Sequence, residues 1–115
     1  MNAAVLGGLV EQWVWRSQKL AMRYELRPAI DLQAEVEKLI GEVEARAREL
    51  AASGPVFLAT VANRLEMRAH IAELPVALAP DELVGPALDA VGRAQALHAL
   101  ARAFEGAAGR LRAAA

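Results

Sequence analysis

The sequence predicts an all-α protein, an antiparallel four-helix bundle formed by a single helical domain over residues 1–115. Three observations predict this fold. Ala, Leu, Arg and Glu, which are strong helix formers, dominate the chain, and 27 of its 115 residues are alanine. Only 14 residues are β-branched, which argues against an all-β domain. Apolar residues recur three and four positions apart between prolines and glycines, a spacing typical of packed amphipathic helices.

The first helix is expected over residues 2–26. Asn2 is a suitable N-cap, and Pro28 ends the helix because it disfavours α geometry at the preceding residue. Side chains two positions apart on a helix point to nearly opposite sides, so Trp13 and Trp15 cannot both face the core. The expected core stripe of this helix is Leu6, Val10, Trp13, Ser17, Leu20 and Tyr24.

The second helix is expected over residues 31–52, with Asp31 as its cap. Gly54 is expected to be the C′ residue that ends it, and Pro55 the first residue of the next element. Two exposed i,i+4 ion pairs are expected, Glu42 with Arg46 and Glu44 with Arg48. The expected core stripe is Leu32, Val36, Leu39, Ile40, Val43, Ala47 and Leu50.

The third segment, residues 56–74, has two interpretations. As a helix, it aligns Leu58, Val61, Leu65 and Ala72, and its second half consists of strong helix formers. Residues 65–71 also alternate apolar and polar, which is typical of a strand, so residues 56–71 form a β-hairpin in the alternative α+β fold. The helix is favoured because the turn at residues 62–64 lacks a tight-hairpin signal.

The last part of the chain begins with a short apolar linker, residues 76–79, between Pro75 and Pro80. A helical turn is expected from Pro80, with a kink or break near Gly85-Pro86. The main helix is expected over residues 86–112. Small and large residues alternate along one face of it, so a neighbouring helix can approach closely. That stripe is Ala90, Ala94, Leu97, Ala101, Phe104, Ala108 and Leu111.

Composition and charge exclude several classes of function. The 13 basic and 14 acidic residues are mixed along the chain, so nucleic-acid binding is not expected. With residues 56–71 as a hairpin, the layout would resemble that of some small bacterial nucleoid-associated proteins, but the charge balance argues against DNA binding in that case too. Without cysteine there is no disulfide or thiolate metal site. No Gly-rich phosphate loop or nucleophile elbow is present, and no cofactor is expected. The apolar run over residues 3–10 is too short to span a membrane. We expect a cytoplasmic, bacterial protein.

The function favoured by the sequence is that of a non-enzymatic interaction or assembly module. Trp15 lies off the core stripe and aligns with Met22, and with Ala4 and Gly8 on its other side. Trp and Met are enriched in the centres of protein interfaces. We therefore expect these four residues to form a partner interface, in a homo-oligomer or in a small subunit of a larger bacterial complex.

The alternative is a small helical enzyme or metal protein, and two constellations support it. Glu66, His70 and Glu73 share one helix face at i, i+4 and i+7, a spacing that can hold a divalent ion if a second helix adds ligands. Arg64 precedes His70, and Arg93 precedes His98, at a spacing that resembles the Arg…His pair of HEPN-class helical ribonucleases. The resemblance extends only to this spacing. It implies a dimeric ribonuclease in which His acts as acid or base and Arg binds phosphate.

Overall fold

The computed structural model describes the backbone of residues 2–78 and 85–114, and the side chains of residues 2–74 and 91–114. Four α-helices account for most of the described chain: α1 (Ala3–Leu26), α2 (Leu32–Glu49), α3 (Gly54–Leu78) and α4 (Gly85–Ala113). A 3₁₀ turn, Ala51–Ser53, precedes α3. None of the described residues lies in a strand. The predicted all-α, four-helix fold is therefore confirmed, and the β-hairpin alternative for residues 56–71 is wrong.

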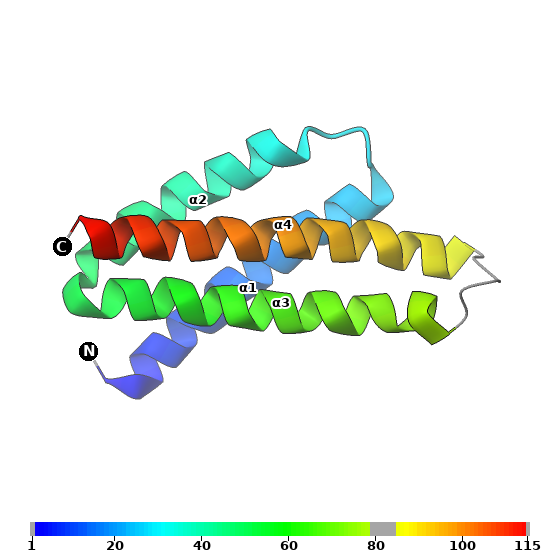
Figure 1. The fold of residues 1–115 in the computed structure, drawn as a ribbon. Helices are drawn as coiled ribbons and strands as arrows, with labels where there is room; N and C mark the ends of the chain where they lie inside the picture. The colour runs from blue at the N-terminus through cyan, green and yellow to red at the C-terminus, as the bar shows by residue number, and fades with distance from the viewer. Residues whose placement is uncertain (1, 79–84, 115) are drawn as a thin grey trace.

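The four helices alternate in direction, and the two ends of the chain lie at the same end of the molecule (Figure 1). Helices α3 and α4 lie side by side, nearly antiparallel, and share the most extensive interface. Helices α1 and α2 form a V that crosses this pair obliquely. The α3–α4 pair is therefore close to antiparallel, whereas α1 and α2 cross it at an angle.

The two predicted N-caps are confirmed. The Asn2 side chain accepts a hydrogen bond from the Val5 amide at 2.9 Å, and the Asp31 side chain accepts one from Ala34 at 3.1 Å. Each cap satisfies an amide that the first helical turn leaves without a backbone partner. Helix α1 ends at Leu26, two residues before Pro28, as the sequence predicts.

The corner between α2 and α3 differs from the prediction. Helix α2 ends at Glu49, and the left-handed residue that follows it is Ala51, with φ of 53°, rather than Gly54. Gly54 is helical and opens α3. A Cβ there would overlap the carbonyl oxygen of Ala47 and lie 2.8 Å from Leu111 Cδ2. Gly54 is thus required for close packing at this corner, not for backbone conformation.

Helix α3 continues through Pro75 to Leu78, so the predicted linker is wrong for residues 76–78. An interior proline removes one backbone hydrogen bond and crowds the carbonyl four residues earlier, yet Pro75 lies within α3. Its described buried apolar residues follow helical spacing: Phe57, Leu58, Val61, Ala62, Leu65 and Ala69. The turn expected near Pro80 lies outside the described residues. The expected kink or break near Gly85-Pro86 also involves residues outside the described part of the chain. Pro86 lies in the first turn of α4, where proline is tolerated.

Helix α4 is central to the core and contacts all three other helices. Ala94, Ala101 and Ala108 are buried, together with Leu97 and Phe104, as the stripe predicts. Ala90 lies outside the described side chains. The small residues of α4 therefore allow close packing of neighbouring helices of the same chain. The predicted core stripes of α1 and α2 are also confirmed, and Trp13 is buried.

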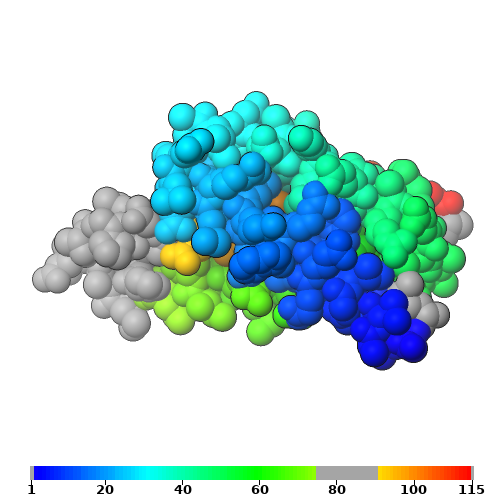
Figure 2. All heavy atoms as spheres, turned by 180° about the vertical axis from the view of Figure 1, so that it is seen from behind, coloured from blue at the N-terminus to red at the C-terminus, as the bar shows by residue number. Residues whose placement is uncertain are grey.

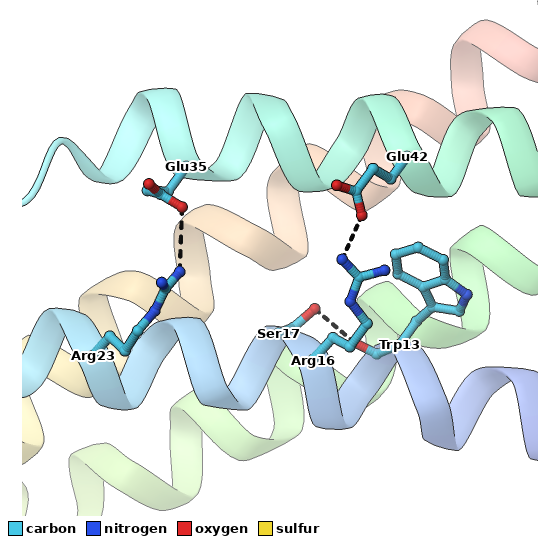
Figure 3. A network of polar contacts seen from close by, with 6 residues as sticks. All are labelled: Trp13, Arg16, Ser17, Arg23, Glu35 and Glu42. Carbon is cyan, nitrogen blue, oxygen red and sulfur yellow. Dashed lines mark hydrogen bonds and ion pairs between the residues drawn. The ribbon is translucent and has the colours of Figure 1, made fainter.

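Polar contacts hold the two arms of the V together (Figure 3). Arg16 of α1 forms an ion pair with Glu42 of α2, and its guanidinium lies 4.4 Å from the Trp13 ring centroid. Ser17 is buried, and its hydroxyl donates to the Trp13 carbonyl at 2.8 Å. The Glu42–Arg46 pair expected within α2 is therefore wrong, because Glu42 pairs across the helices. The expected pair of Glu44 with Arg48 is confirmed at 3.6 Å.

Candidate functional site

Helix α1 crosses one broad side of the molecule, between α2 and α3, with its outer face at the surface (Figure 2). Trp15 is 57 % exposed and Met22 49 % exposed, although both are large apolar residues. Ala4 and Gly8 are also exposed. All four residues of the predicted partner interface thus lie on the surface of α1. Trp13, two residues from Trp15, is buried, so the two tryptophans divide between core and surface as predicted.

The exposed residues of α1 are arranged symmetrically about Trp15. A helix turns about 100° per residue. Residues 4, 7 and 11 positions before or after Trp15 therefore point within about 40° of the direction of Trp15. On the N-terminal side these positions hold Glu11, Gly8 and Ala4, and on the C-terminal side Lys19, Met22 and Leu26. All six are exposed. We call this set of seven residues the α1 face.

The two halves of the α1 face have opposite character. The N-terminal half is acidic and small, whereas the C-terminal half is basic and bulky. A Cβ added at Gly8 would meet no atom of the chain within 4 Å, so packing within this chain does not require a glycine there. Sequence reasoning found four members of the face and missed Leu26, Glu11 and Lys19, whose spacing from Trp15 was the available signal.

A second candidate site lies between α3 and α4. Glu66, His70 and Glu73 of α3 surround His98 of α4, and the two imidazole rings meet edge to face, with centroids 5.5 Å apart. His98 Nδ1 lies 2.9 Å from Glu66 Oε1, and His98 Nε2 is hydrogen bonded to Glu73 Oε1. His70 lies 3.4 Å from Glu66 and 3.6 Å from Glu73. We call these four residues the His/Glu cluster.

The pKa values of this cluster reflect its mutual contacts. Partial burial acts to lower the pKa of His98, but hydrogen bonds to Glu73 and Glu66 outweigh burial and raise it above the usual 6.5. The hydrogen bond from His98, aided by the nearby charge of both histidines, lowers the pKa of Glu73 below 4.5. The sequence identified the three α3 residues as one face, and the structure adds His98 from the neighbouring helix.

The structure does not bring each arginine of the ribonuclease hypothesis to its histidine. Arg64 forms an ion pair with Glu11 of α1, and Arg93 lies 3.2 Å from Glu25 of α1. Each arginine is five or six residues from its histidine, which places the two on helix directions more than 100° apart. The two histidines instead meet each other, with carboxylates rather than guanidinium groups around them.

The chain matches no protein-family model, no curated protein and no solved structure. None of the helices, over the described residues, has a stretch long and apolar enough to cross a membrane. The structure is that of an all-α protein whose four helices pack against one another.

Proposed function

We propose that this chain is a non-enzymatic assembly module, and that its partner at the α1 face is a second copy of itself. The observation that carries the proposal is the symmetry of the α1 face about Trp15. A two-fold axis through Trp15 would pair two α1 helices antiparallel, so that residue i faces residue 30 − i of the other copy. Such an interface uses the same surface on both subunits and must be self-complementary.

The α1 face meets this requirement in size and in charge. In the antiparallel register, Gly8 faces Met22 and Ala4 faces Leu26, so that each small residue receives a large one. Glu11 faces Lys19, which places opposite charges together at both ends of the pair. Trp15 meets Trp15 at the axis, where two aromatic rings can stack with an offset.

The apolar area at the axis is sufficient to matter energetically. Trp15, which is 57 % exposed, offers roughly 140 Å² to a partner, worth about 3.5 kcal/mol on complete burial. Two copies contribute to each dimer. If each Trp15 contributes only about 1 kcal/mol, its removal from both subunits raises the dimer Kd about 30-fold.

Light scattering on two variants of the α1 face tests the proposal. Wild type is expected to have the mass of a dimer, and Trp15→Ala the mass of a monomer at the same concentration. Gly8→Leu is the sharper variant, because the added side chain has open space in its own chain but meets Met22 of the second copy. It is expected to weaken the dimer while the free energy of unfolding of the monomer stays equal or rises.

Matched controls use equivalent positions outside the α1 face. Met67→Ala removes an exposed apolar side chain from α3, and Gly109→Leu adds one at an open glycine of α4. Both are expected to remain dimers. A monomeric wild type, or a Trp15→Ala dimer of unchanged Kd, contradicts the proposal. The cytoplasmic location and bacterial origin expected from composition remain part of it.

A further inference from the structure

We propose that the His/Glu cluster between α3 and α4 is a binding site for one divalent transition-metal ion of the zinc class. Glu66 and His70 of α3 and His98 of α4 supply one ligand atom each, and Glu73 orients His98. This inference does not depend on self-association through α1.

The three ligand atoms are already close to coordination distance from one another. A tetrahedral ion with bonds of about 2.0 to 2.2 Å holds neighbouring ligand atoms roughly 3.3 to 3.5 Å apart. Glu66 Oε1 lies 3.4 Å from His70 Nε2 and 2.9 Å from His98 Nδ1. One ligand atom from each of the three residues fits within 4.8 Å of the others. Small side-chain rotations therefore suffice to admit an ion.

Glu73 occupies the position of an outer carboxylate. If His98 Nδ1 binds the ion, its Nε2 carries the ring hydrogen and donates it to Glu73 Oε1, the contact that the structure contains. A carboxylate behind a metal-binding histidine fixes the tautomer and the ring orientation. His98 is only 18 % exposed, so its ring is further held by packing between the helices.

Charge explains why the cluster favours a cation. In the described part of the chain, the glutamates that form ion pairs elsewhere, such as Glu11, Glu25 and Glu42, do so with arginine. Glu66 and Glu73 instead pair with histidines, whose imidazole nitrogens can bind a metal ion as well as a proton. Two carboxylates that share two imidazoles gain from an added positive charge, either a proton or a metal ion. Mixed imidazole and carboxylate ligands suit Zn²⁺ and its neighbours better than Mg²⁺ or Ca²⁺.

Titration calorimetry with ZnCl₂ tests the site on untagged, chelator-treated full-length protein. We expect saturable binding of one Zn²⁺ per chain, with release of protons. Glu66→Gln and His70→Gln are expected to raise the Kd at least about 10-fold, and Glu73→Gln about 10-fold through loss of orientation. His70 and Glu66 are substantially exposed, so both variants are expected to fold. Circular dichroism checks this.

The control is Glu105→Gln, which removes an exposed carboxylate from α4 outside the cluster. Its Zn²⁺ affinity is expected to equal that of wild type. Co²⁺ gives an independent readout, because its visible absorption intensifies when the ion enters a four-coordinate site. We expect a smaller increase in absorption with His70→Gln than with wild type. Absence of saturable Zn²⁺ binding, or equal binding by wild type and both ligand variants, overturns the proposal.

Discussion

The corner between α2 and α3 provides a stability test in which two identical substitutions have opposite effects. In Gly54→Ala the new methyl group overlaps the backbone carbonyl of Ala47 and lies 2.8 Å from Leu111 Cδ2. The leucine can rotate away, but the carbonyl belongs to the last turns of α2 and can move only with the helix. Overpacking of this kind lowers the free energy of unfolding by about 1 to 3 kcal/mol. The higher helix propensity of alanine over glycine offsets about 0.5 to 1 kcal/mol of this loss.

The mid-range values give an expected net loss for Gly54→Ala of about 1.3 kcal/mol, or a Tm about 5 °C lower. Gly41→Ala is the matched control, because a Cβ at this glycine within α2 meets no atom within 4 Å. It is expected to raise the free energy of unfolding by about 0.5 to 1 kcal/mol. Urea denaturation of wild type and both variants, followed by circular dichroism, measures the difference. A Gly54→Ala protein as stable as Gly41→Ala would refute the close packing at this corner.

Two further predictions concern backbone conformation and pH. Ala51→Gly is expected to stabilise the protein by about 0.5 to 1 kcal/mol in urea denaturation, because glycine relieves the left-handed conformation at φ of 53°; a loss of stability contradicts this. In metal-free protein, the contribution of His98 is fully present below pH 6.5 and is lost as pH rises through its raised folded pKa. The free energy of unfolding is therefore expected to fall as the pH rises above about 6.5, and to fall less in His98→Gln; an identical decline in both proteins contradicts this.

The features that the sequence predicted correctly depend on the geometry of a single helix. The stripe through Val10, Trp13 and Leu20 follows from helical periodicity alone, and so does the separation of Trp13 from Trp15. The N-caps at Asn2 and Asp31 are likewise local, because each side chain reaches an amide three residues away. For such features, neighbouring residues determine the outcome.

The features that the sequence did not predict depend on how separate helices meet. Glu42 has an arginine four residues away, yet it pairs with Arg16 because the crossing of α1 over α2 brings the two together. His98 joins Glu66 and Glu73 only through the register of α4 against α3. Spacing within α3 predicted a three-residue face, but not the ligand from α4.

The most direct test of self-association through the α1 face exchanges its charges. Glu11→Lys and Lys19→Glu each place like charges together at both ends of the antiparallel pair, which is expected to weaken each homodimer about 10-fold or more. In an equimolar mixture, every such contact between the two variants is again acid against base. Light scattering is therefore expected to give monomers for each variant alone and dimers for the mixture. A mixture with the same mass as its separate components would contradict the antiparallel pairing about Trp15.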